Sequence, residues 1–117
     1  MLSVLLLCFA CALQAQTVRL LVQSSPLAGY RYHQAAGIWH LLRIGDSLDL
    51  VREPDNPHDA LAIRVEWQGR MLGYVPRREN DALAWAMDRG EALRARISRM
   101  DARRAAYRRL EFEVYVE

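Results

Sequence analysis

The sequence predicts a small, mainly β domain: an antiparallel sheet of about six strands, curled into an OB-like barrel, with one or two short helices. Three observations predict this class. Several short stretches alternate apolar and polar residues, most clearly residues 91–100 and 107–116. Clusters of Pro, Gly, Asn and Asp separate these stretches and are typical of turns. A chain of 117 residues is the size of one domain with a modest core.

The first half of the chain predicts short elements. Val and Leu alternate over residues 17–23 and predict a strand, which Ser24-Ser25-Pro26 should end. Residues 34–43 carry apolar side chains at helical spacing and predict a short helix, although Gly37 weakens it. Residues 46–52 predict the next strand.

The central stretch, residues 52–77, predicts a β-hairpin with a polar loop at its start. Residues 60–67 alternate, Gln68-Gly69 form a two-residue turn, and residues 71–75 form the return strand. Pro76 should end that strand.

Beyond the hairpin, the sequence predicts one firm helix before the two alternating strands. Asn80 or Asp81 can cap a helix within residues 78–89, and Gly90 provides a C-terminal stop. Its apolar face should carry Leu83, Ala84 and Met87. The three tryptophans occupy apolar-face positions and are expected in the core: Trp39, Trp67 and Trp85.

The N-terminal segment, residues 1–15, has the pattern of an export signal: an uncharged apolar stretch that ends in small residues. The mature chain would begin near Gln16, and the folded domain would cover residues 17–117. Both cysteines, Cys8 and Cys11, lie in this segment, so a processed domain would have no disulfide and no cysteine-based metal site. A lipoprotein signal that uses Cys11 is the competing interpretation.

Cleavage of this segment would place the protein in the periplasm or outside the cell, with no membrane span left. Without cleavage we expect a cytoplasmic protein. In either case we expect a monomer.

The charge pattern is dominated by arginine. The formal net charge is only +2, but all 16 basic residues are Arg. Arg presents a planar set of donors that suits phosphate, although a GC-rich genome would also enrich it. A basic run near the C-terminus could follow a polyanion or could be a solvated face: Arg94, Arg96, Arg99, Arg103, Arg104, Arg108 and Arg109.

The polar loop in front of the hairpin concentrates side chains with chemistry. Asn56, His58 and Asp59 lie close together in a stretch with two prolines, and proline fixes φ and stiffens the loop. A His–Asp pair is compatible with acid–base chemistry or a metal. The simpler interpretation is that Asp55 and Asn56 cap their own turn and that Asp59 anchors the loop. No nucleophile or third ligand lies nearby in the sequence, so no catalytic residue and no metal ligand is assigned, and a hydrolase built on His58 and Asp59 is only a remote alternative.

Aromatic and basic residues alternate on both sides of this loop. Tyr30, Arg31 and Tyr32 precede it, and Tyr74 and Arg77 follow it. Aromatic rings stack on bases and Arg neutralises phosphate, which together favour a single-strand-binding surface. Core tyrosines beside surface arginines are the alternative.

These motifs, taken together, resemble the HIRAN domain. The sequence has G-x-R-Y at residues 29–32, R-x-P-x-N-P-x-D at 52–59, A-I-x-V at 62–65, and two glycines followed by Tyr and Val at 69–75. The resemblance covers about residues 17–100, with its motif core at 27–100. HIRAN domains lie at the N-terminus of Swi/Snf-type fork-reversing DNA helicases and also occur alone in bacteria. The resemblance implies a modified OB-like barrel that captures the free 3′-hydroxyl end of single-stranded DNA.

Carried over position by position, the resemblance implies a role for each matching residue. Tyr32 would stack on a terminal base, and Arg31 and Arg77 would contact phosphate. Asn56 and Asp59 would reach the terminal base or sugar, with Asp59 accepting from the 3′-hydroxyl.

Two positions depart from the family pattern. His58 lies where DNA-binding members can carry an aromatic residue, and Tyr74 lies where they can carry His. The aromatic residue and the histidine are thus exchanged, and base stacking is the part of the function that this exchange affects. Both side chains are nevertheless included in the expected binding site.

The sequence lacks the motor of the longer relatives. It has no G-x-x-x-x-G-K-[ST] motif, so ATP hydrolysis is not expected, and we lean toward a protein that is not an enzyme. No cofactor is expected; zinc would be implied only by labels inherited from longer family members. The expected partner is single-stranded DNA or another polyanion. The alternative is an exported domain that binds a protein or another non-nucleic-acid partner.

Overall fold

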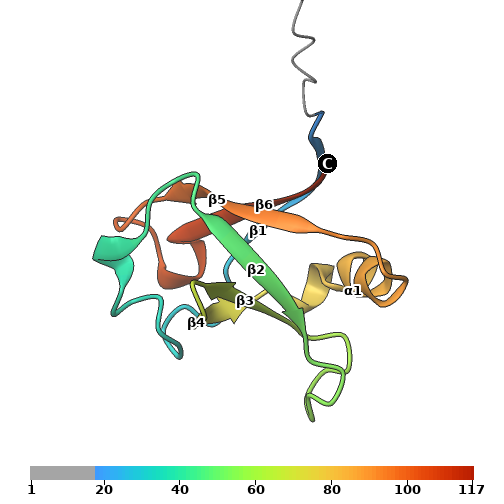
Figure 1. The fold of residues 1–117 in the computed structure, drawn as a ribbon. Helices are drawn as coiled ribbons and strands as arrows, with labels where there is room; N and C mark the ends of the chain where they lie inside the picture. The colour runs from blue at the N-terminus through green and yellow to red at the C-terminus, as the bar shows by residue number, and fades with distance from the viewer. Residues whose placement is uncertain (1–17) are drawn as a thin grey trace, which may run out of the picture.

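The computed structural model describes residues 18–117, which form one curled six-stranded antiparallel sheet (Figure 1). The strand order is β1-β6-β5-β2-β3-β4. The mainly β class and the six antiparallel strands of the sequence prediction are confirmed. The strands are β1 (Leu20–Pro26), β2 (Ser47–Arg52), β3 (Ile63–Trp67), β4 (Arg70–Tyr74), β5 (Arg94–Met100) and β6 (Leu110–Val116).

Strand β2 joins the two halves of the sheet. Its first two residues, Ser47 and Leu48, pair with β5, and the rest of the strand pairs with β3. Because one strand serves both halves, the sheet bends along β2, which crosses diagonally between β5 and β3 in Figure 1.

The bend brings the two edges of the sheet together. Just after β1, Ala28 and Tyr74 exchange two backbone hydrogen bonds of 2.9 Å, which form an isolated antiparallel bridge to the end of β4. Gly73 allows this approach, since a Cβ atom there would lie 2.2 Å from the carbonyl oxygen of Ala28. Gly73 therefore has a steric role, because an added side-chain atom would displace the chain after β1.

The hairpin β3–β4 turns as predicted. Gln68 and Gly69 both have positive φ, 47° and 78°, as a two-residue type I′ turn requires. Strands β3 and β4 begin and end within a few residues of the bounds that the sequence predicted.

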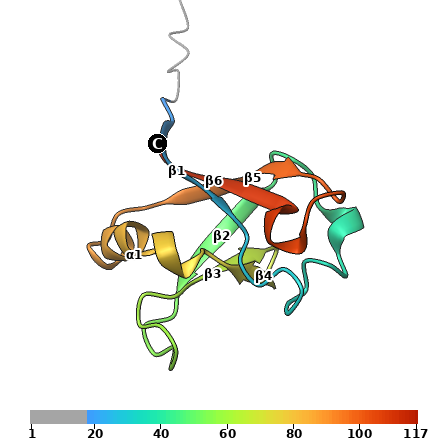
Figure 2. The same ribbon diagram turned by 180° about the vertical axis from the view of Figure 1, so that it is seen from behind.

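Helix α1 (Asp81–Asp88) lies at one end of the curled sheet, and the segment that contains the 3₁₀ turn η1 (Trp39–Leu41) lies at the other (Figures 1 and 2). The helix follows the 3₁₀ turn η2 (Arg77–Glu79) and ends at Asp88, two residues before Gly90, which has φ of 88°. The stop predicted at Gly90 is confirmed. The last 3₁₀ turn, η3 (Ala106–Arg108), leads into β6.

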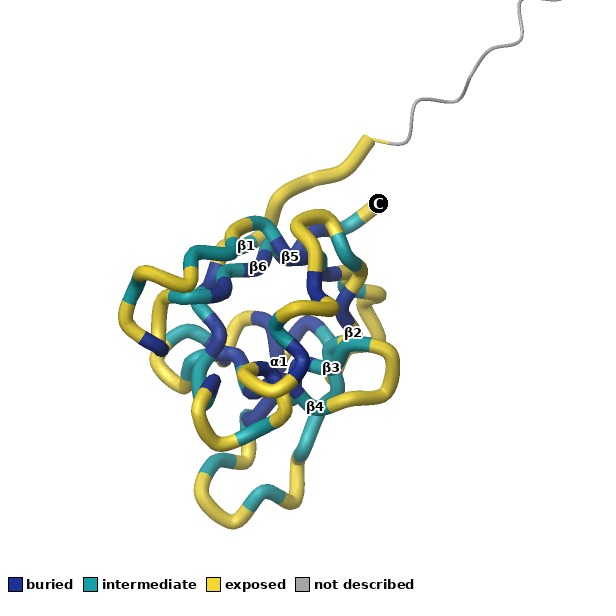
Figure 3. Tube along the Cα trace, turned by 90° about the vertical axis from the view of Figure 1, so that its left-hand side faces the viewer, coloured by how far each residue is buried: buried dark blue, intermediate teal, exposed yellow. Residues whose placement is uncertain are grey.

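Buried apolar side chains from the sheet and α1 form a single core cluster. Figure 3 shows buried positions gathered in the strands and α1, whereas the start of β1 and the loop after β2 are mostly exposed. The largest fully buried apolar side chains come from all parts of the domain: Phe112, Leu27, Leu42, Ile63, Leu72, Leu83, Ile97 and Leu110.

Two predicted elements in the first half are wrong in detail. Ser24-Ser25-Pro26 does not end the first strand but continues β1, paired with Glu113, Phe112 and Glu111 of β6. Proline is tolerated there because β1 is an edge strand and Pro26 is its last residue.

The helix predicted over residues 34–43 is also wrong. The segment is a series of turns. Ile38 donates to the carbonyl of Gln34 four residues back, but Leu41 and Leu42 then donate three residues back, to Ile38 and Trp39, so the chain closes a 3₁₀ turn and not a regular helix. The backbone N–H of Gln34 donates to Met71 of β4. The apolar spacing was nevertheless informative, since Ala35, Ile38 and Leu42 are buried.

Trp85 is the one tryptophan that does not belong to the core. Leu83, Ala84 and Ala86 are the buried residues of α1, and Trp85 points away from them with 52% of its surface exposed. Trp39 and Trp67 pack against the core, as expected.

The predicted export signal, residues 1–15, lies outside the described residues, as do both cysteines. It remains a prediction. Within residues 18–117, the structure contains no helix of the length and apolarity needed to cross a bilayer.

Candidate functional site

The loop between β2 and β3 is built by its own polar side chains. Asn56 Oδ1 accepts hydrogen bonds from the backbone N–H groups of His58 (2.9 Å) and Asp59 (3.2 Å). Its Nδ2 donates to Glu53 Oε1 at 3.0 Å. Asn56 thus uses its side chain to shape the turn, as the simpler interpretation of the sequence predicted. The cap predicted at Asp55 is wrong, since its exposed side chain makes no hydrogen bond within residues 18–117.

Asp59 is fixed from two sides. Its Oδ1 accepts the backbone N–H of Leu61 at 2.9 Å, and its Oδ2 accepts Asn80 Nδ2 at 2.7 Å. The bond from the Leu61 N–H is the main cause that lowers the pKa of Asp59, and Asn80, Arg77 and Arg52 add to it against the opposing effect of burial. Asp59 is therefore an ionised acceptor with a defined orientation at neutral pH.

Asn80 links this carboxylate to the helix. It occupies the N-cap position of α1, but its side chain makes no capping bond and donates to Asp59 instead. The cap predicted at Asn80 is therefore wrong in its side-chain partner, although the position is right. Asn80 is only 2% exposed, so its bond to Asp59 is shielded from water.

These side chains border one pocket, which we call the loop pocket. It has a volume of about 320 Å³, in the size range of small-ligand sites. Ala28 and Tyr74, the residues of the closing bridge, form part of its wall, so the pocket exists because the sheet edges meet. Its lining residues are Ala28, Asn56, His58, Asp59, Ala62, Tyr74, Val75 and Arg77.

Tyr74 contributes its ring to the loop pocket rather than a free hydroxyl. The hydroxyl donates to Glu53 Oε1 at 2.9 Å, and the ring packs edge-on against His33 with centroids 5.5 Å apart. Burial, together with the hydrogen bond to the side chain of Glu53, raises the pKa of Tyr74. The side chain of Tyr74 is thus held in place by Glu53 and His33.

A second hollow, which we call the tyrosine groove, is lined partly by the residues that follow Ala28 in the sequence. Ala28 lines the loop pocket, and the next residue, Gly29, lines the groove. The groove has a volume of about 360 Å³. It is lined by Gly29, Tyr30, Arg31, Tyr32, Ala105, Ala106 and Tyr107.

Two tyrosines of the groove expose most of their surface. Tyr32 is 84% exposed and Tyr107 is 63% exposed, although aromatic side chains of this size are usually more buried. Three small residues also line the groove: Gly29, Ala105 and Ala106. The guanidinium of Arg108 lies over the Tyr107 ring, 5.5 Å from its centroid, so the ring of Tyr32 is the more open flat surface for a ligand.

The structure divides the predicted site residues between these two hollows. Asn56, His58, Asp59, Tyr74 and Arg77 line the loop pocket, and Arg31 and Tyr32 line the tyrosine groove. Tyr107 was missed, because its place within the basic run suggested only the start of a strand. The two hollows are lined by residues that are neighbours in the sequence, Ala28 in the loop pocket and Gly29 in the tyrosine groove.

The metal alternative gains no ligand set from these contacts. In the part of the chain that the structure describes, no three side chains of the types His, Cys, Asp and Glu come together as a cation site.

Comparisons with known proteins identify relatives of this arrangement. The family model of the HIRAN domain matches residues 20–117. A crystal structure of a protein from Lactobacillus plantarum, from a structural genomics consortium, superposes with a TM-score of 0.72 at 27% identity, over 84% of this chain and 94% of that one. The crystal structure of the HIRAN domain of human HLTF superposes with a TM-score of 0.60 at 22% identity, over 87% of this chain and 83% of that one. No functionally curated protein matches the sequence.

Proposed function

The chain belongs to the HIRAN family, a family of DNA-binding modules, and from this premise we propose that it binds single-stranded DNA and takes the free 3′ end into the loop pocket. One observation carries the proposal: Asp59, an oriented and ionised carboxylate, lines the same pocket as Arg77 and the ring of Tyr74.

The carboxylate of Asp59 suits a hydroxyl ligand. Each of its oxygens accepts one hydrogen bond within the protein, from Leu61 and from Asn80, and each keeps a further lone pair. A sugar 3′-hydroxyl can donate to such a lone pair. A 3′-phosphate would instead bring negative charge against the ionised carboxylate, so the pocket should discriminate between the two ends.

The rest of the pocket suits a nucleotide. Ala28, Ala62 and Val75 provide apolar contact for a base or sugar, and the ring of Tyr74 provides a flat surface. Arg77 is exposed, and no carboxylate among the described residues forms an ion pair with it, so its guanidinium is free for a phosphate. His58 is exposed at the rim and offers a smaller ring than the aromatic residue that it replaces.

The tyrosine groove gives the strand a path away from its end. Tyr32 and Tyr107 expose their rings along the groove, and Arg31 lies between Tyr30 and Tyr32 in its lining. We therefore propose that the nucleotide next to the terminal one stacks in the groove, while the terminal nucleotide occupies the loop pocket. This assigns base stacking to the groove, where the exchange of His58 and Tyr74 has no effect.

The test measures binding of 5′-labelled single strands by fluorescence anisotropy at low salt. We expect Asp59→Asn to weaken binding of a linear strand about tenfold or more, since a charge-assisted hydrogen bond contributes about 1.5–3 kcal/mol. Asp55→Asn is the matched control: it removes the same charge from the same loop, at an exposed residue that makes no hydrogen bond or ion pair with other described residues. A closed circular strand without a 3′ end should bind more weakly to wild type.

Equal binding of the linear and the circular strand would refute capture of an end. Equal changes in affinity in Asp59→Asn and Asp55→Asn would show that Asp59 has no specific contact with the strand, and the role of Asp59 would be withdrawn.

A further inference from the structure

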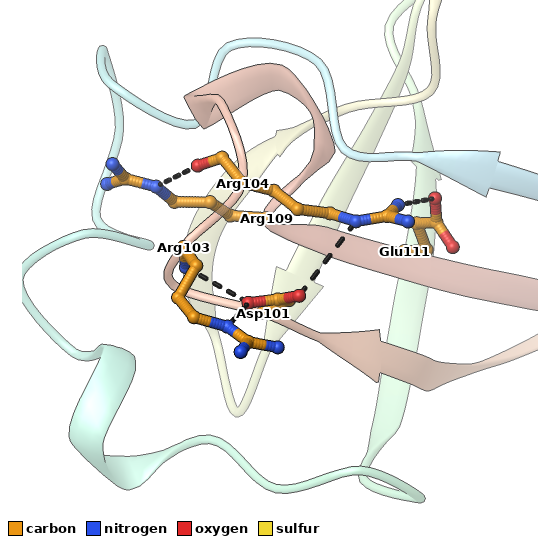
Figure 4. Close-up of polar contacts among 5 residues, drawn as sticks. All are labelled: Asp101, Arg103, Arg104, Arg109 and Glu111. Carbon is orange, nitrogen blue, oxygen red and sulfur yellow. Dashed lines mark hydrogen bonds and ion pairs between the residues drawn. The ribbon is translucent and has the colours of Figure 1, made fainter.

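The connection between β5 and β6 separates its arginines into two groups. Asp101 accepts the side chain and the backbone N–H of Arg103, at 3.2 and 3.0 Å, and lies 3.9 Å from Arg104. Glu111 lies 3.5 Å from the other side of Arg104. Figure 4 shows Arg104 reaching toward these carboxylates, while Arg109 extends in the opposite direction. The acidic groups of this region are therefore used by Arg103 and Arg104.

Arg109 is held by uncharged partners instead. Its Nε donates to the backbone oxygen of Arg104 at 2.9 Å, and its guanidinium lies over the ring of Tyr30, 5.6 Å from the centroid. Tyr30 is only 6% exposed and packs edge-on against Trp39, with centroids 5.8 Å apart, so the ring is a fixed support. Tyr30 also lines the tyrosine groove.

This arrangement orients a full positive charge without neutralising it. A ring below and a carbonyl at Nε fix the plane of the guanidinium, and no carboxylate of the described residues lies within ion-pair distance. The two terminal nitrogens keep their donors, and such a pair of donors matches the oxygens of one phosphate. Since the side chain is already oriented, little rotamer entropy is lost when a phosphate binds.

We propose that Arg109, which lies over the groove residue Tyr30, is a phosphate-binding residue beside the tyrosine groove and that it grips an internal phosphate of the bound strand, beyond the terminal nucleotide. The inference rests on the proposed function, because the strand must first enter the loop pocket. Arg31 is exposed in the groove lining and Arg109 lies over Tyr30, so both would then contact the backbone of the bound strand. The ligand is thus a single strand of several nucleotides with a free end, not a mononucleotide.

The experiment measures the salt dependence of binding of a 5′-labelled linear strand to the full chain. Each phosphate contact contributes about 0.7 to the slope of log K against log salt for single strands, so Arg109→Gln should lower the slope by about that amount. Arg70→Gln is the control, because Arg70 is exposed at the start of β4, forms no ion pair within the described residues and lines neither hollow. Its slope should stay close to that of wild type.

Strands with one neutral methylphosphonate linkage identify the phosphate. Wild type should lose about tenfold in affinity at one internal linkage, and Arg109→Gln should be insensitive to replacement of that linkage alone. Arg109→Lys, which keeps the charge but not the planar pair of donors, should keep the slope and lose affinity. The thermal midpoints of Arg109→Lys and Arg109→Gln, each compared with that of wild type, show whether either change acts through folding.

The outcomes separate the two proposals. If wild type binds no strand with a free 3′ end, the proposed function fails and this inference fails with it. If wild type captures the end but Arg109→Gln keeps the wild-type slope and the wild-type sensitivity at every linkage, only the role of Arg109 is overturned.

Discussion

Closure of the sheet at Gly73 can be tested by adding one carbon atom. In Gly73→Ala the new Cβ would lie 2.2 Å from the carbonyl oxygen of Ala28 and 3.0 Å from two atoms of Leu27. The backbone oxygen must retreat by more than 1 Å to reach an ordinary contact distance, which is of the order of 3.4 Å or more. That movement would break the two hydrogen bonds of 2.9 Å between Ala28 and Tyr74.

The expected cost combines two effects. Two backbone hydrogen bonds contribute about 1–3 kcal/mol together, and forcing an extra carbon against buried Leu27 costs about 1–3 kcal/mol. We therefore expect Gly73→Ala to lower the free energy of unfolding by about 2–5 kcal/mol, a large part of the usual stability of a small domain.

Urea unfolding followed by tryptophan fluorescence measures this difference. Gly37→Ala is the matched control: its added Cβ would lie 3.7 Å from the nearest heavy atom, an ordinary contact, and its φ is not positive. That change should be neutral or slightly stabilising. If Gly73→Ala unfolds at the same urea concentration as Gly37→Ala, the contact between the two edges does not stabilise the fold, and the account of how the loop pocket forms is wrong.

Two further predictions concern Asp59 and α1. Because the pKa of Asp59 is lowered in the folded state, its ionised form stabilises the fold above the ordinary carboxyl pKa of 3.8, and this contribution disappears as pH falls through the folded value. Urea titrations at several pH values measure the difference in the free energy of unfolding between wild type and Asp59→Asn. This difference should be constant from pH 5 to 8 and shrink below pH 4. A difference that stays constant down to pH 2 would contradict the stabilising role of ionised Asp59. On α1, Leu83→Ala should cost about 2–5 kcal/mol since Leu83 is 1% exposed, whereas Trp85→Ala should cost less than about 1 kcal/mol since half of Trp85 is exposed. Equal thermal midpoints for these two variants would show that the assignment of the buried helix face is wrong.

Much of the fold could be predicted because local patterns and tertiary structure agree. The alternation in β5 places Ala95 and Ile97 inside, as their burial shows, and the positive φ of Gly69 and Gly90 follows from what a tight turn and a helix end require. The errors occur where distant partners decide. Gln34 donates to Met71, and β1 continues through Ser25 because β6 pairs with it. Neither partner is visible from local periodicity.

The candidate site shows the same division. The chemistry of Asn56 and Asp59 was visible because loop residues of these types lie together in the sequence. The role of Asn80 was not, since a residue at a helix start is expected to cap the helix, and only the folded chain brings it to Asp59 across 21 positions. Tyr107 reaches the groove of Tyr32 for the same reason: 75 residues separate them in the sequence, and the sheet brings their segments together. Whether these residues bind DNA stays a prediction.

The central claim is that the loop pocket accepts a free 3′-hydroxyl at Asp59. The most direct measurement is the ratio of dissociation constants for one single-stranded sequence that ends in a 3′-phosphate or in a 3′-hydroxyl. We predict that the phosphorylated strand binds wild type at least about tenfold more weakly and that this ratio falls toward one in Asp59→Asn. Equal affinity of wild type for the two strands would contradict the claim.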